Sequence, residues 1–281
     1  MKILFPTDYS KNSRNAFRFA CYVAEKMKAR ITLLHTYQIP ILKNSVPAAM
    51  MAHNIQQQKH VQQKKLKGFV EDFKTHATVL PIDQIELDYL IESGDLQEVI
   101  ADLSNEQDFD LIIMGTKGAT NSEEAKFGSN TSKIIEKVSI PVLAIPSEAN
   151  YQGFKNVAFT EDFEEKDTEP LNFIKNLKTL FGAHLSIVHI REVEDNSNPT
   201  RMQNYNDIKY RSIRTLPDTD IDIIHGLDKV LALDEFMKEQ KTDLLAMVGR
   251  VQNQENTNKS KRLITEMVLH TQTPLIVFPK S

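Results

Sequence analysis

The sequence contains two copies of one pattern of short apolar runs, and this duplication restricts the fold more than any other feature. Residues 3–8 (ILFPTD) match 157–162 (VAFTED), and residues 30–35 (RITLLH) match 184–189 (HLSIVH). In both pairs the second run follows the first by 154 residues. We therefore expect a tandem duplication, in which one chain contains two domains of the same fold.

The second copy is shorter than the first. Two later runs also recur, but only 133 residues apart: 110–114 as 243–247, and 141–146 as 274–279. The offset between the copies is 154 residues in their first parts and 133 in their last parts. The second copy has therefore lost 21 residues, between His189 and Gly226. The chain has 281 residues, which fits two domains of common size. We expect the first to span 1–148 and the second 153–281.

Composition and charge exclude several classes of protein. With 41% hydrophobic and 26% charged residues, the chain is neither low-complexity nor disordered. Its 34 basic and 38 acidic residues give a net charge of -4, so no nucleic-acid partner is expected. The single cysteine, Cys21, cannot form an intramolecular disulfide, and it falls on an apolar helical stripe typical of a core. No stretch has the apolar length of a signal peptide or a membrane span. We therefore expect a cytoplasmic protein with no membrane partner.

Strand-like and helix-like patterns alternate along each copy. The strand-like runs of the first copy are 2–7, 30–36, 85–91, 110–115 and 141–146. Several are apolar throughout, which is typical of parallel strands covered by helices on both faces. Helical apolar stripes follow Ser10 and Asp95, and a third helix is expected from about Asn130 to Lys137. The pattern predicts an α/β doubly wound domain, present twice.

Segment 50–76 has the pattern of a long and very polar helix. It contains a run of three glutamines from Gln56 and the pair Lys64-Lys65. Two interpretations stay open: a solvated helix with a narrow buried stripe, or a surface that binds a partner.

A glycine motif follows the fourth strand of the first copy. Gly115 and Gly118 are separated by two residues, and Gly128 comes nine residues after Gly118, directly before Ser129. Glycines allow a backbone to approach a ligand closely, and a helix N-terminus attracts anions, so the motif is typical of a phosphate site to which Ser129, Thr131 and Lys117 can add donors. The alternative is a tight turn followed by a helix that Ser129 or Asn130 caps.

Other signatures are absent from the sequence. There is no P-loop, no G-x-G-x-x-G fingerprint, no H-E-x-x-H and no G-x-S-x-G. Asp8, at the end of the first strand, is a candidate either to accept hydrogen bonds from adenine or ribose or to cap the next helix. His35 ends the second strand without a second ligand candidate, which is typical of a packed histidine. No catalytic residue and no protein metal ligand is assigned.

Taken together, these motifs resemble the universal stress protein family in its tandem form. The resemblance rests on the strand ending in Asp8, Leu33-Leu34-His35, Gly94-Asp95, the run 110–115, the G-x2-G-x9-G-S motif and Pro141-Val142-Leu143. It implies two five-stranded parallel sheets in strand order 3-2-1-4-5, of the adenine nucleotide alpha hydrolase-like type. It also implies that the closing strands 141–146 and 274–279 pair as an intramolecular pseudo-dimer, to which a homodimer of the chain can be added.

The family further implies an ATP site in the first domain, with Mg²⁺. The residues implied at the adenine end are Pro6, Thr7, Asp8 and Thr36. Those implied at the ribose and phosphates are Met114, Gly115, Gly118, Gly128, Ser129, Asn130 and Thr131. The second copy keeps Asp162 and Gly249 but has no later glycine, and only Arg250 or Arg262 is left to meet an anion. We expect it to have kept the fold and lost the nucleotide.

Three functions are compatible with this sequence. The first is an ATP-binding regulator of the stress response, a role that the resemblance implies. The second is an enzyme with slow ATP hydrolysis or phosphoryl transfer, for which Asp8 would position water or metal, although no arginine finger or dedicated base is visible. The third is a nucleotide-free interaction scaffold that uses segment 50–76.

Overall fold

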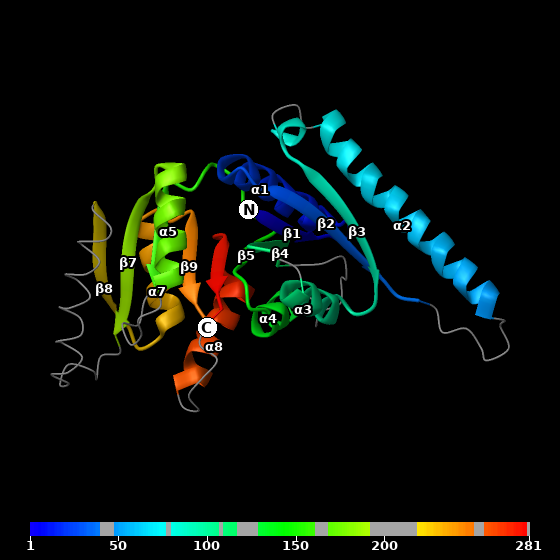
Figure 1. Cartoon of the computed structure of the whole chain (residues 1–281). Helices are drawn as coiled ribbons and strands as arrows, with labels where there is room; N and C mark the ends of the chain where they lie inside the picture. Colours follow the sequence, from blue (N-terminus) through cyan, green and yellow to red (C-terminus); the bar gives the residue numbers. More distant parts are fainter. Residues whose placement is uncertain are drawn as a thin grey trace. The chain divides into compact units, whose positions relative to one another are not determined.

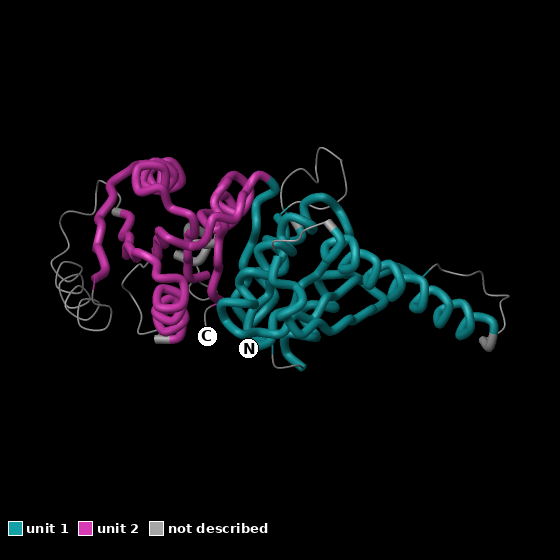
Figure 2. Tube along the Cα trace, turned by 90° about the horizontal axis from the view of Figure 1, so that it is seen from above, with its two compact units in different colours: residues 1–147 teal, residues 148–281 magenta. Residues whose placement is uncertain are grey.

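The computed structural model divides the chain into two compact units, residues 1–147 and 148–281 (Figures 1 and 2). It describes residues 1–39, 48–76, 80–106, 109–116, 129–160, 168–191, 218–249 and 256–279. No helix within these ranges is both long and apolar enough to cross a membrane.

Unit 1 is built on a parallel sheet in the order β3-β2-β1-β4-β5. Its strands are β1 (Lys2–Pro6), β2 (Arg30–Tyr37), β3 (Leu87–Ser93), β4 (Leu111–Gly115) and β5 (Val142–Ile145). Its helices are α1 (Lys11–Met27), α2 (Ala48–His76), the short 3-10 helix η1 (Ile82–Gln84), α3 (Leu96–Glu106) and α4 (Ser129–Lys137). The predicted α/β class and the strand order 3-2-1-4-5 are confirmed.

Helix α1 shows why the chain turns back after β1. The Ser10 side chain accepts a hydrogen bond from the backbone N–H of Ser13 at 3.1 Å and so caps the helix N-terminus. The helix ends where Lys28 adopts a left-handed φ of 50°. Phe17, Ala20 and the other buried residues of α1 repeat at helical spacing and face the sheet.

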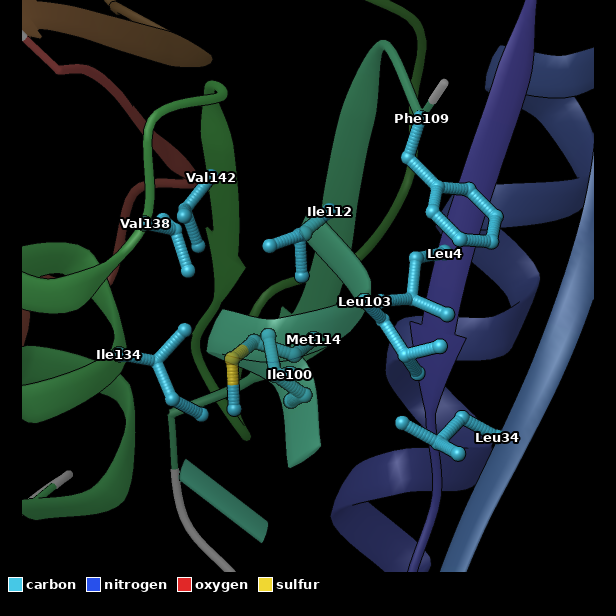
Figure 3. Close-up of a cluster of buried hydrophobic side chains, with 10 residues drawn as sticks. All are labelled: Leu4, Leu34, Ile100, Leu103, Phe109, Ile112, Met114, Ile134, Val138 and Val142. Carbon is cyan, nitrogen blue, oxygen red and sulfur yellow. The ribbon is translucent and has the colours of Figure 1, made fainter. Parts of the chain in front are cut away.

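Side chains of β1 alternate between the two faces of the sheet, and both faces are covered. The ring centroid of Phe5 lies 5.2 Å from that of Phe17 of α1. The Phe17 ring in turn contacts Phe69 and Phe73 of α2. The neighbouring Leu4 points to the opposite face, where it joins the cluster that α3 and α4 form with β4 and β5 (Figure 3). Helices α1 and α2 therefore cover one face, and α3 and α4 cover the other.

The third strand begins later than the sequence pattern suggests. The predicted run starts at residue 85, whereas β3 starts at Leu87. Ile82 and Ile85 are buried at η1, so the apolar run begins before the ladder in which Leu87 pairs with Ile31.

Unit 2 repeats the strand order of unit 1. Its strands are β6 (Asn156–Thr160), β7 (His184–Arg191), β8 (Thr219–His225), β9 (Leu244–Val248) and β10 (Leu275–Phe278). Its helices are α5 (Thr168–Phe181), α7 (Lys229–Glu239) and α8 (Asn256–His270). Counted from β6 as the first strand, the parallel order β8-β7-β6-β9-β10 is again 3-2-1-4-5.

One repeated carboxylate fixes the same strand pair in both units. Asp110 accepts a hydrogen bond from the backbone N–H of Lys2 at 2.6 Å. In unit 2, Asp243 accepts from the N–H groups of Lys155 and Asn156 at 2.9 and 3.1 Å. These contacts lie at the amino ends of the strands, so they are part of the scaffold and leave the opposite edge of each sheet to ligands.

Truncation of Leu4 to Ala is expected to destabilise unit 1. Leu4 is fully buried among α3, α4, β4 and β5, so the variant loses transfer free energy and leaves a cavity. We expect the free energy of unfolding to fall by about 2–5 kcal/mol. Urea unfolding followed by circular dichroism measures this fall, with Val61→Ala on exposed α2 as the control. Equal effects of the two substitutions would contradict the assigned core.

Candidate functional site

Parallel pairing brings the carboxyl ends of β1, β2 and β4 to one edge of the unit 1 sheet. β1 lies between β2 and β4. If each ladder is continued by the few residues beyond its last pair, Asp8 lies beside Thr36 and Thr7 lies beside Gly115. Ligands of doubly wound sheets bind at this edge, where the direction of winding changes.

Thr7 uses its hydroxyl to shape the turn that follows β1. Its backbone N–H donates to the Leu34 carbonyl at 2.8 Å, and its Oγ1 donates to Ser13 Oγ at 3.0 Å. The same Oγ1 accepts from the Tyr9 N–H at 3.0 Å. Thr7 is buried, as is the neighbouring Pro6. Both residues therefore form the buried floor beneath the carboxyl end of β1, and neither presents a polar side-chain group to a ligand.

Asp8 lies on the surface of this edge. Its Oδ1 accepts a hydrogen bond from the Ser10 N–H at 3.0 Å, which supports the turn into α1. The cap of α1 itself is Ser10, so this contact belongs to the turn before the helix and leaves the ligand interpretation of Asp8 a prediction. The side chain is exposed, so the carboxylate also lies where a solvent-borne donor can reach it.

Tyr9 and His35 form a stacked pair beside Asp8 that the sequence did not indicate. Their ring centroids lie 4.4 Å apart with an interplanar angle of 32°. Tyr9 has a left-handed φ of 64°, which is uncommon for a residue other than glycine and which directs its ring toward β2. No local sequence pattern signals this conformation.

The His35 ring has a defined tautomer. Its Nδ1 lies 2.8 Å from the Thr7 carbonyl oxygen. A carbonyl oxygen only accepts, so Nδ1 carries the hydrogen and donates it. Burial lowers the pKa of His35 below its usual 6.5, although the bond to Thr7 opposes that effect. Burial also raises the pKa of the Tyr9 hydroxyl. Both rings are therefore neutral at pH 7.

The N-terminus of α4 is attached directly to the end of β4. The buried Thr131 donates its hydroxyl to the Gly115 carbonyl oxygen at 3.2 Å. Beside it, the Asn130 carboxamide oxygen accepts from Gln97 Nε2 of α3 at 3.2 Å. This bond leaves the Asn130 NH2 group as a donor at the helix N-terminus, where the helix dipole is positive.

Ser132, in the first turn of α4, has a hydroxyl whose environment is unusual. Its Oγ is buried, and no hydrogen-bond partner is present for it in the described structure. A buried hydroxyl without a partner is costly, so a group that binds at this turn can satisfy it. No sequence pattern distinguishes Ser132 from Ser129 at this turn.

The remaining expected residues divide into two groups. The Met114 side chain is buried in the cluster with Ile134 and Ile100 (Figure 3), so only its backbone is available at the edge. Thr36 is half-buried on β2, next to His35. The others lie outside what the structure describes: Lys117, Gly118 and Gly128, together with the side chain of Ser129.

Unit 2 differs at the position that corresponds to Gly115. In unit 1 Gly115 pairs with Ile145, and in unit 2 the matching pair is Val248 with Phe278. A branched side chain therefore replaces the glycine at the end of the fourth strand. Arg262 donates to Glu266 at 2.7 Å, and Asp162 and Arg250 lie outside the described residues. In the described parts of both units, no cluster of three or more His, Cys, Asp or Glu is placed to hold a metal ion.

Comparison with known proteins identifies the family. The Universal stress protein family pattern matches residues 1–146, which is more than half of the chain. The chain therefore belongs to the universal stress protein family.

Relatives agree with this assignment. A universal stress protein of Helicobacter pylori is 30% identical over 145 residues, covering 51% of this chain and 98% of the relative. Universal stress protein Slr1230 of Synechocystis is 24% identical over 218 residues, covering 72% of this chain and 73% of the relative. The crystal structure of a universal stress protein from Archaeoglobus fulgidus has a TM-score of 0.71 at 16% identity and covers 100% of this chain and 98% of that chain. The last likeness shows that the fold of the whole chain is shared.

The imidazole of His35 is expected to titrate below pH 6.5, and Tyr9→Ala is expected to bring its pKa back toward that value by exposing the ring. Because the unfolded chain binds this proton more readily than the folded one, the contribution of neutral His35 to stability is complete above about pH 6.5. That contribution is lost as the pH falls through the lowered pKa. An NMR titration of the ring nitrogens measures the pKa of His35 in the wild type and in Tyr9→Ala, and His35→Gln assigns the signal. A value above 6.5 in the wild type would refute the buried pair.

Proposed function

We propose that unit 1 binds ATP at the carboxyl ends of β1 and β4 and acts as a nucleotide-dependent regulatory module. The observation that carries this proposal is the hydrogen bond from Thr131 to Gly115, which holds the N-terminus of α4 against the end of β4. The first residue of the glycine motif, Gly115, accepts this bond, and its last residue, Ser129, begins the helix that the bond holds. A positive helix end beside glycine backbone suits phosphate oxygens.

The two ends of the site suit the two ends of ATP. At β1, the exposed Asp8 carboxylate can accept hydrogen bonds from the adenine amino group or ribose hydroxyls, and the continued β1–β2 register places Thr36 next to it. At α4, backbone N–H groups, the Asn130 amide and the Ser132 hydroxyl are donors for the phosphates. Mg²⁺ is proposed to enter with ATP, because it commonly keeps water and phosphate ligands and needs only one or two carboxylates.

The chain's own residues do four things in this proposal. Thr7 and Pro6 fix the floor, Thr131 positions the helix end, and Asp8 orients the nucleoside. The neutral Tyr9–His35 pair adds no charge next to the ligand. None of these roles is a proton transfer to a reacting atom, so we propose binding rather than catalysis as the function. Slow ATP hydrolysis stays the alternative that the assay below detects.

We propose that residues 153–281, within unit 2, form a degenerate second domain that binds no nucleotide. Val248 supports this proposal because it places a branched side chain where Gly115 lets the backbone come close to a ligand. An intramolecular pseudo-dimer through 141–146 and 274–279, a homodimer of the chain and a cytoplasmic location stay predictions.

Wild-type protein is expected to bind one ATP per chain, and Gly118→Asp combined with Gly128→Asp is expected to abolish this binding. The two carboxylates repel phosphate, and their side chains occupy positions that the motif reserves for backbone. Isothermal titration calorimetry on nucleotide-stripped protein measures the stoichiometry. Gly68→Asp on α2 is the control, because a Cβ there meets no atom within 4 Å.

Each stoichiometry has a different meaning. Two ATP per chain would refute the degenerate second domain. No binding at millimolar ATP would refute the nucleotide proposal and leave the scaffold function. Phosphate release over many turnovers, absent in the glycine variant, would make the protein an ATPase.

Thr131→Val is expected to weaken ATP binding roughly 2- to 10-fold, which corresponds to about 0.4–1.4 kcal/mol. Valine keeps the shape of threonine but loses the hydroxyl that holds α4 to Gly115. Thr131→Ser keeps the hydroxyl and should bind nearly as well as wild type. Calorimetry measures the Kd for ATP of the three proteins. If the valine variant bound ATP as tightly as the wild type, the contact between Thr131 and Gly115 would not position the site.

A further inference from the structure

Helix α2 extends well beyond the part of it that rests on the sheet (Figures 1 and 2). Its buried residues are confined to the C-terminal part: Leu66, Phe69, Val70 and Phe73. Every side chain of residues 50–65 is exposed or half-buried, including Met50 at 59% and Val61 at 47% exposure. Residues 48–65, called the α2 arm from here on, are about 27 Å long.

The charge of the arm is of one sign. Residues 48–65 contain three lysines and two histidines but no Asp or Glu. Lys59 and Lys64 of the arm form no ion pair with any described residue. By contrast, Arg14 and Lys74 near the buried end of α2 pair with Asp72 and Glu71. The arm is therefore an exposed basic helix with apolar residues and no acidic partner in the described part of its own chain.

The next part of the chain has the opposite charge. Residues 75–116 contain ten Asp and Glu and no Lys or Arg. On α3, the exposed positions Glu98, Asp102, Asn105 and Glu106 lie on one side of the helix, away from its buried residues Ile100 and Leu103. Among these acids, Glu98 pairs with Lys137, whereas Asp102 and Glu106 form no ion pair with a described residue.

The sheet of unit 1 keeps these two surfaces apart. α2 packs with α1 on one face, as the Phe17 contact with Phe69 shows, and α3 packs with α4 on the other. The arm also runs away from the sheet, so it cannot bend back to the acidic side of its own unit. A second copy of the chain can present its α3 to the arm, and twofold symmetry makes the contact reciprocal, with two arms and two acidic helices.

We infer that the α2 arm docks on the acidic side of α3 in a second copy of this chain. Opposite charges steer the two helices together and fix which surfaces meet, while Met50 and Val61 supply apolar contact. This assembly differs from pairing of the closing strands, and it does not depend on nucleotide binding.

The test is a charge exchange in the full-length chain. One variant carries Lys59→Glu and Lys64→Glu, and a second carries Asp102→Lys and Glu106→Lys, which spares the Glu98–Lys137 pair. A third chain combines all four substitutions. The control carries Lys11→Glu and Lys26→Glu on exposed positions of α1. Sedimentation velocity is recorded for each over a roughly hundredfold range of concentration, at low salt and at about 1 M salt.

Wild type and control are expected to associate beyond 32.1 kDa at low salt and to dissociate at high salt. Each of the first two variants should associate at least about tenfold more weakly, because like charges then face one another. A mixture of those two variants, and the combined chain alone, should recover the wild-type association, since opposite charges meet again. Recovery also shows that the variants are folded.

Three results would overturn the inference. They are a wild type that stays at 32.1 kDa throughout, a dimer that neither charge reversal weakens, and a combined chain that fails to recover association although its circular dichroism is native. Binding of wild-type monomer to phosphatidylserine vesicles, lost with Lys59→Glu and Lys64→Glu, would assign the arm to a lipid surface instead.

Discussion

Parallel strand pairing is the constraint on which the rest of this structure depends. A parallel sheet needs crossover helices and apolar side chains on both faces, and the adjacent residues Leu4 and Phe5 meet that need by pointing to opposite layers. The same geometry gathers all carboxyl ends at one edge, beside the N-termini of α1, α3 and α4. It also separates α2 from α3, so basic and acidic helices of one unit cannot neutralise each other.

Much of the fold was predictable because its signals are local and occur twice. A continuously apolar run such as 111–114 lacks the polar–apolar alternation of a surface strand, and its recurrence at 244–247 locates the same strand in both copies. Ser10 and Asp95 marked helix starts by their own capping chemistry, and the structure shows both accepting the expected backbone N–H bonds. The strand order, however, came from family resemblance, since no local pattern encodes which strands become neighbours.

The site was less predictable because tertiary contacts determine what its side chains do. Thr131 was expected to hold phosphate, yet its hydroxyl is directed to Gly115, and Met114 faces the core. Tyr9 joins the edge only because of a left-handed backbone, and Ser132 stands out only because its Oγ is buried. Such features depend on the packing of residues distant in sequence, which motif spacing does not record.

The two halves of α2 are stabilised by different means. Beyond Leu66 toward its N-terminus the helix gains no core burial and relies on the helix propensity of its Ala, Met, Gln and Lys residues. The free end of α2 is therefore expected to open more readily than its buried end, so amide hydrogen exchange should be faster near Met50 than near Phe73. A docking partner would suppress that gradient by ordering the free end.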